Sequence, residues 1–199
     1  MASSKQHSEP VRWLGDLTGD ERPLAGGKGG TLARLYQAGY PVPDGFVVLP
    51  SAFAGDELRP ETWTQVRAYL QRMRHGRARK TQWRPGVRMP ERCVAVAVRS
   101  SAVGEDSAQA SFAGEFETVL DVATDGAIRD AIHTVRRSRD SERVRAYSQL
   151  QDLEAEHEMA IIVQRLVLTE VSGVLFTADP VSGSHNRMVG NLVLGPGEK

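Results

Sequence analysis

Short apolar runs, separated by glycine, proline and polar residues, dominate the hydrophobic pattern along this 199-residue chain. Runs rich in valine, isoleucine and leucine that are bounded by turn residues are typical of buried β-strands. The pattern predicts five such strands, at 45–49, 94–98, 159–167, 171–177 and 188–194. We expect the third and fourth of these strands to be joined by a short turn.

Apolar residues recur every three or four positions in three other segments, which predicts amphipathic helices. The first helix follows a glycine-rich stretch and has Leu32 and Leu35 on one face, with Gly39 just beyond its C-terminal end. The second covers 61–75. The third has isoleucine and valine at helical spacing, and we expect Asp125 to cap its N-terminus.

The predicted strand at 94–98 leads directly into Arg99, and small and polar residues follow it up to residue 114. We therefore place Arg99 at the C-terminal end of a strand, where open α/β sheets bind ligands. Glycine and serine residues let the following backbone approach an anion closely. A fixed cation beside such a loop suits a polyphosphate, and an ordinary surface turn with a solvated arginine is the alternative.

Lys28 lies between two pairs of glycines at the start of the first predicted helix. A helix N-terminus directs N–H groups and the positive end of its dipole toward a ligand, and Lys28 adds a full charge there. The common phosphate-loop pattern is absent, because Arg22 and Gly29 occupy the positions where that pattern has glycine and serine or threonine. A flexible turn with a solvated lysine is the alternative interpretation.

Composition limits the class of protein. The chain has 25 basic and 25 acidic residues, so its net charge gives no reason to expect a nucleic-acid or membrane partner. The single cysteine, Cys93, excludes an internal disulfide framework and favours a cytoplasmic location. No apolar run approaches the roughly 20 residues of a membrane helix. Residues 1–9 are predicted to form a flexible polar tail without the apolar core of a secretory signal.

Residues 67–92 are strongly basic, with Glu91 as the single acidic residue among them. Such a segment could bind an anionic partner such as nucleic acid. We favour a solvated helix followed by a loop, because aromatic side chains that could stack on bases are sparse in this segment.

Three long motifs of this sequence resemble one protein family, in the family's own order. They are AGGKGGTLARLYQAGYPVPDGFVVLPSAF, AVRSSAVGEDSAQASFAGEFETVLDV and IIVQRLVLTEVSGVLFTADPVSG. They resemble the N-terminal ATP-binding domain of the phosphoenolpyruvate synthase and pyruvate phosphate dikinase family, which includes rifampin phosphotransferases. The resemblance covers most of 11–197 and is poor over the basic segment 67–92. It implies that 10–199 form one partial domain, incomplete at its C-terminal end.

The resemblance implies an α/β (α+β) fold of the ATP-grasp type, with mixed sheets and ATP held between two lobes. Lys28 and Arg99 match the family's phosphate-binding lysine and arginine, to which the family assigns both binding and catalysis. Gly114 and Thr118 match residues of the loop that covers the phosphates. The interpretation of Lys28 and Arg99 from their sequence context alone agrees with these roles, since phosphoryl transfer relies on positioned cations.

At the other end of the nucleotide, Gln164 matches the family's strand residue at the adenine. Arg165 and Leu166 would contribute adjacent backbone and an apolar wall. The alternative for Gln164 is a strand amide that faces solvent or caps a sheet edge.

In this family, ATP phosphorylates a histidine on a separate swivelling domain, with Mg²⁺ as cofactor. The histidine then passes the phosphoryl group to pyruvate or another acceptor. No histidine of this chain lies in a similar motif, and the family's magnesium ligands would follow residue 199. We therefore expect the chain to need the remaining part of the domain and the histidine domain, in cis or as a partner chain. Alone it would not be active. The alternative is a non-catalytic ATP-binding or regulatory module that lost the metal ligands and the histidine.

Overall fold

The computed structural model describes residues 9–75, 95–103, 117–141, 158–167 and 169–197. The chain divides into two compact units, Met1–Leu166 and Val167–Lys199. The domain boundaries expected from the sequence, with a tail at 1–9 and a partial domain at 10–199, stay predictions.

The first unit is built on a five-stranded sheet with the strand order β1-β2-β7-β5-β6. Every described pairing in this sheet is antiparallel, so the mixed sheets that we expected are not formed by the described residues. An apolar run predicts a buried strand but contains no information on the direction of its neighbours. The strands are β1 (Val11–Trp13), β2 (Gly45–Val48), β7 (Met159–Arg165), β5 (Val96–Ala102) and β6 (Thr118–Val122).

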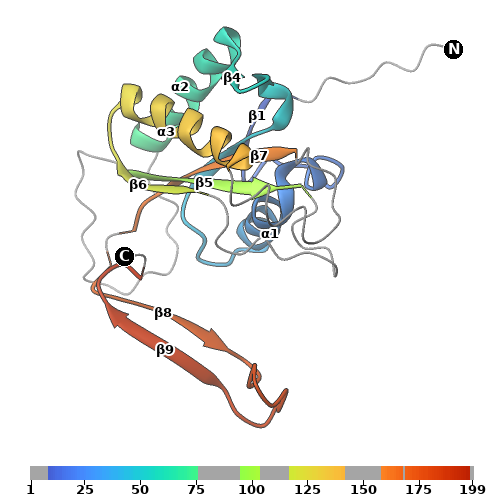
Figure 1. Ribbon diagram of the computed structural model, residues 1–199, viewed down its shortest axis with the longest axis vertical. Helices are drawn as coiled ribbons and strands as arrows, with labels where there is room; N and C mark the ends of the chain where they lie inside the picture. The colour runs from blue at the N-terminus through green and yellow to red at the C-terminus, as the bar shows by residue number, and fades with distance from the viewer. Residues whose placement is uncertain (1–8, 76–94, 104–116, 142–157, 168, 198–199) are drawn as a thin grey trace, which may run out of the picture. The chain divides into compact units, whose positions relative to one another are not determined.

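Helices cover both faces of this sheet, as Figure 1 shows, with α2 and α3 on one face and α1 on the other. The helices are α1 (Gly26–Gln37), α2 (Pro60–His75) and α3 (Asp125–Arg137). Short elements complete the unit: η1 (Pro23–Ala25), η2 (Pro50–Ala52), β3 (Phe53–Ala54), β4 (Glu57–Leu58) and η3 (Ser138–Asp140). Among the described residues, no helix is both long enough and apolar enough to cross a membrane.

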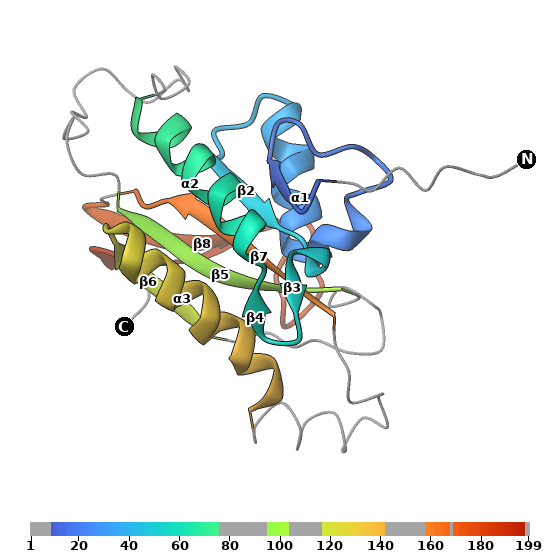
Figure 2. The same ribbon diagram turned by 90° about the horizontal axis from the view of Figure 1, so that it is seen from above.

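Ion pairs join α2 and α3, the two helices that cover the same face of the sheet. Figure 2, a view from above, shows α2 and α3 lying over the same side of the sheet. Arg74 and Arg67 of α2 lie 2.7 and 3.6 Å from the carboxylate of Asp125 in α3. Part of the basic segment 67–92 is therefore a helix with paired charges, as we favoured, and its residues 76–92 lie outside the described part of the chain.

Alternation along the strands divides the core between the two faces of the sheet. We call them the α2/α3 face and the α1 face. On the α2/α3 face, buried side chains of β2, β5 and β7 pack with α2 and α3, among them Phe46, Val98, Val163, Leu70 and Ile132. On the α1 face a smaller cluster joins α1 to β2 and β7, among them Ala33, Tyr36, Val47, Ala160 and Ile162.

The ends of two predicted elements differ from the structure. Asp125 is the first residue of α3, whereas the cap is Thr124, whose hydroxyl accepts a hydrogen bond from the Ala127 N–H at 3.2 Å. Both residue types can cap a helix, so the sequence did not separate two adjacent candidates. The strand that we expected at 94–98 is β5, Val96–Ala102.

The expected turn between the last two strand segments of the motif 161–183 does not make them partners. β7 pairs with β2 and β5 in the first unit, whereas β8 (Val171–Phe176) pairs with β9 (Val189–Leu194) in the second. The prediction of three separate strands is confirmed, and the two strands on either side of the short connection pair with different partners. Loop length alone does not specify strand pairing when another strand offers a longer apolar match.

The second unit is the β8–β9 hairpin and its connecting segment. Asp179 begins the predicted turn, and its carboxylate accepts hydrogen bonds from the Ser182 hydroxyl at 2.7 Å and from the Val181 N–H at 2.9 Å. These hydrogen bonds, that of Ser182 foremost, lower the pKa of Asp179 from its ordinary value. Gly183 follows with a φ of 68°, a conformation that glycine adopts readily.

Candidate functional site

Lys28 is the third residue of α1, in a first turn that otherwise consists of glycines. The turn lies very close to β5: Gly26 has a φ of 72°, and a Cβ on it would lie 2.6 Å from the carbonyl oxygen of Ala102. Only glycine fits there. The first turn has no acidic residue, so the charge of Lys28 adds to the positive end of the helix dipole. This arrangement favours an anionic ligand.

Ser101 of β5 joins that first turn to the sheet. Its hydroxyl donates a hydrogen bond to the carbonyl oxygen of Ala25 at 2.7 Å and accepts one from the N–H of Gly29 at 2.9 Å. The Ser101 side chain is fully buried. The hydroxyl therefore fixes the residue before α1 and the residue after Lys28 against one point of β5.

Arg99 lies two residues before Ser101 in the same strand. Side chains two apart in a strand point to the same face, so Arg99 lies with Ser101 on the α1 face. Its neighbour Val98 points to the other face, where it belongs to the core under α2 and α3. Thr118, which we expected in a loop, is instead the first residue of β6, because it pairs directly with Arg99. This pairing places both side chains on that face. The structure thus brings Arg99 and Thr118 together, on the sheet face against which the Lys28-bearing helix packs.

The position of Arg99 within its strand corrects one expectation. We placed Arg99 at the C-terminal end of a strand, but it is the fourth residue of β5, which continues through Ala102. The small residues after Arg99 read as a loop because they lack apolar bulk. They are strand residues here because Ser100, Ser101 and Ala102 pair with Ile161, Ala160 and Met159 of β7.

Gln164 lies on the same sheet face, in β7, where it pairs with Ala97 of β5 and Gly45 of β2. Its side chain is buried, and its amide nitrogen donates a hydrogen bond to the carbonyl oxygen of Pro43 at 3.1 Å. A solvated strand amide, the alternative interpretation, does not describe it. An amide has two N–H groups and a carbonyl, so the Pro43 contact leaves capacity for a further partner.

Arg165 and Leu166 follow Gln164, and their backbone N–H groups are already paired. The Arg165 N–H donates to the carbonyl oxygen of Asp44 at 2.8 Å, and that of Leu166 to Ala95 at 2.9 Å. A backbone contact with adenine at these two residues would therefore have to use carbonyl oxygens. The Arg165 guanidinium points to the other face, where it donates to the carbonyl oxygen of Met73 in α2.

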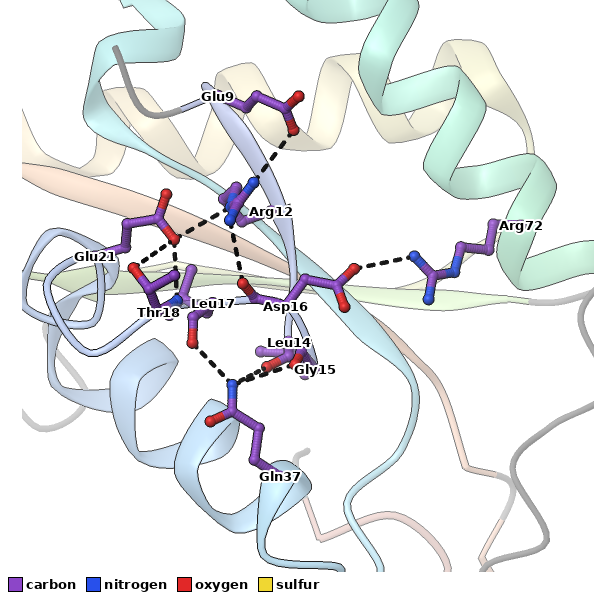
Figure 3. Close-up of polar contacts among 10 residues, drawn as sticks. All are labelled: Glu9, Arg12, Leu14, Gly15, Asp16, Leu17, Thr18, Glu21, Gln37 and Arg72. Atoms are coloured by element: carbon purple, nitrogen blue, oxygen red, sulfur yellow. Dashed lines mark hydrogen bonds and ion pairs between the residues drawn. The ribbon is translucent and has the colours of Figure 1, made fainter. Parts of the chain in front are cut away.

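Glu21 holds the loop that leads from β1 to α1, as Figure 3 shows. One of its carboxylate oxygens accepts hydrogen bonds from the N–H and the hydroxyl of Thr18, both at 3.0 Å, and from Nε of Arg12 at 3.2 Å. The Arg12 guanidinium also donates to the carbonyl oxygen of Asp16. These contacts fix the chain just before η1, so the start of α1 has a defined position.

Gln37 holds the same loop from the last residue of α1. Its amide nitrogen lies within hydrogen-bond distance of three carbonyl oxygens of the loop, those of Leu14, Gly15 and Leu17 (Figure 3). Together with Ser101 and Glu21, Gln37 positions the helix that bears Lys28. Sequence reasoning missed Glu21 and Gln37, which belong to no motif whose chemistry can be read locally, and it placed Ser101 only among the small residues that follow Arg99.

Residues 79–199 match the family model described as the pyruvate phosphate dikinase AMP/ATP-binding domain. The chain belongs to this family. The match contains Arg99, Thr118 and Gln164 and begins after Lys28. It also includes residues 79–92 of the basic segment 67–92, over which we expected a poor match.

Relatives extend the similarity of this AMP/ATP-binding domain to the N-terminal part of the chain. A phosphoenolpyruvate synthase of Aeropyrum pernix is 34% identical over 94% of the chain, and a probable phosphoenolpyruvate synthase of Staphylothermus marinus is 28% identical over all of it. An uncharacterized phosphotransferase of Bacillus subtilis is 34% identical over 88% of the chain. The chain spans 26%, 27% and 22% of the lengths of these three relatives.

Two further expectations concern Gly114 and the ligands of Mg²⁺. Gly114 lies outside the described residues. Within the part of the chain that the structure describes, no three histidine, cysteine, aspartate or glutamate side chains come together as metal ligands. No Mg²⁺ ligand is therefore assigned among these residues.

Proposed function

We propose that this chain binds ATP as the nucleotide-binding part of a phosphotransferase of the phosphoenolpyruvate synthase and pyruvate phosphate dikinase type. One observation carries the proposal: the Ser101 hydroxyl joins the turn that bears Lys28 to the strand that bears Arg99. Two cations on elements that are fixed to each other are what a polyphosphate requires. In phosphoryl transfer the protein contributes positioned charge more than covalent chemistry.

In this proposal Lys28 and Arg99 bind the phosphates, and Thr118, opposite Arg99, lies beside them. Gln164 binds the adenine edge with the part of its amide that Pro43 does not use. Arg165 contributes its carbonyl and Leu166 an apolar wall. The fold is proposed to be of the ATP-grasp type, with Gly114 in a loop over the phosphates. All these residues act on bound nucleotide, and none is assigned a role through Mg²⁺.

A titration with ATP and adenosine tests the phosphate assignment. Lys28→Ala and Arg99→Ala should each weaken ATP binding about 10- to 100-fold, because each removes a charge-assisted contact to phosphate. Adenosine, which has no phosphate, should bind as before. Arg34→Ala is the matched control, since it removes a cation from the last turn of the same helix. Equal losses for ATP and adenosine would show that the assignment is wrong.

The adenine assignment has a separate readout. Gln164→Ala should reduce the preference for ATP over GTP, because a base-edge donor or acceptor would lose its partner. Calorimetric titrations with both nucleotides measure the preference, and circular dichroism verifies the fold. An unchanged preference in a folded variant contradicts the adenine contact.

The complete reaction is proposed to transfer the phosphoryl group from ATP to a histidine on a separate domain, and then to pyruvate or another acceptor. The phosphoenolpyruvate synthases among the relatives motivate this proposal. A cytoplasmic location is proposed from the single Cys93. The 199-residue chain alone is expected to bind ATP without turning it over. ATP consumption with Mg²⁺ present, abolished by Lys28→Ala, would contradict that expectation.

A further inference from the structure

The Ser101 hydroxyl bridges two backbone groups at the start of α1. They are the carbonyl oxygen of Ala25, which precedes the helix, and the N–H of Gly29 in its first turn, and Gly26 between them has a non-helical φ of 72°. Ser101 donates to the first at 2.7 Å and accepts from the second at 2.9 Å. The first turn of α1 is thereby bonded to β5 through a side chain.

This bridge lies between the two proposed phosphate ligands. Gly29 follows Lys28 directly, and Arg99 precedes Ser101 by two residues, a separation of about 7 Å along a strand. The segments are 72 and 76 residues apart in sequence at the two hydrogen bonds. No covalent neighbour can therefore set their relative position.

We propose that Ser101 is a positioning residue, which sets the distance between Lys28 and Arg99 for the phosphates of ATP. This inference rests on the proposed nucleotide site. Ser101 itself touches no phosphate. It acts through Lys28, by holding the turn against the strand so that both cations meet the same polyphosphate.

Loss of the hydroxyl should leave the fold intact. Gln37 and the buried residues Ala33 and Tyr36 still attach α1 to the rest of the unit. The consequence is a turn released from β5, with Lys28 no longer held at its position.

Four forms of the full chain, titrated with ATP and with adenosine, test this role: the unaltered chain, Ser101→Ala, Lys28→Ala and the double variant. Ser101→Ala should weaken ATP about tenfold and leave adenosine within about twofold. Because Ser101 acts through Lys28, it should have little further effect once Lys28 is alanine, which is a non-additive double-mutant cycle. Ser100→Ala is the matched control: Ser100 is buried in the same strand but lies on the α2/α3 face, and its loss should leave the ATP-to-adenosine ratio unchanged.

The outcomes separate the two proposals. Unchanged ATP binding in Ser101→Ala, equal losses for ATP and adenosine, or additive effects of the two substitutions would each overturn the positioning role alone. Failure of the unaltered chain to bind ATP, or binding that does not depend on Lys28, would overturn the proposed function and this inference with it. If Ser101→Ala does not fold, Ser101→Cys replaces it in the cycle, since a thiol occupies the position of the hydroxyl and is a weaker hydrogen-bond donor and acceptor.

Discussion

The two faces of the central sheet differ in what covers them. On the α2/α3 face, large apolar side chains such as Phe46, Leu70 and Ile132 form one continuous core. On the α1 face the apolar cluster is smaller, and the same strands present Arg99, Ser101 and Gln164. One face of the sheet stabilises the fold, and the other supports the proposed site.

Glycine makes this division possible. A helix with large side chains in its first turn would stand away from the sheet, and its backbone would not reach a serine hydroxyl. Gly26 and Gly29 let α1 approach β5 until backbone groups and Ser101 form hydrogen bonds. The polar contacts thus replace part of the apolar core on the α1 face.

The largest expected effect is that of Phe46→Ala on the α2/α3 face. Phe46 is fully buried and stacks on Tyr69 with a centroid distance of 5.5 Å. Its truncation should lower the free energy of unfolding by about 3 to 5 kcal/mol, as measured by urea denaturation. The ATP-to-adenosine affinity ratio of the folded variant should not change. A changed ratio would mean that the two faces are not separate in function.

Gly26→Ala tests the close packing on the α1 face. An alanine at a φ of 72° and a ψ of 174° costs about 1 to 3 kcal/mol, and its Cβ would overlap the backbone of Ser101 and Ala102. We expect this loss of unfolding free energy or more, together with weaker binding of ATP relative to adenosine. Gly126→Ala is the control on the other face, because its Cβ would meet nothing within 4 Å in the first turn of α3. If both substitutions had the same effect, close approach would not be the reason for Gly26.

Tyr69 sharpens the comparison through a small effect. Burial against the α2/α3-face core, and secondly the Glu9 carboxylate, raise the pKa of the Tyr69 phenol above its ordinary value of 10.0. A raised pKa means that the neutral phenol stabilises the folded state fully below pH 10. This stabilisation is then lost as the pH rises through the folded-state pKa. The difference in ultraviolet titration between the chain and Tyr69→Phe measures the pKa, and a value at or below 10.0 would contradict it.

Local pattern was sufficient for the three helices and for the strands β2, β5 and β7 of the first unit. The apolar period predicted α2 almost to the residue, because Val66, Leu70 and Met73 recur on one face. Gly39, with its φ of 87°, ends α1 as expected, since a positive φ at a helix end favours glycine. Both signals are visible in the sequence because they depend on residues within a few positions of each other.

The sequence by itself thus determined the three helices, five of the strand segments, the family and two candidate cations, Lys28 and Arg99. Tertiary structure decided the antiparallel strand order, the position of Arg99 within β5 and the role of Ser101. A strand order with β7 between β2 and β5, and a hydroxyl shared by two backbone groups more than seventy residues away, depend on contacts that local periodicity does not contain. Ser101 reads as one small residue among several until the fold places Ala25 and Gly29 on either side of its hydroxyl.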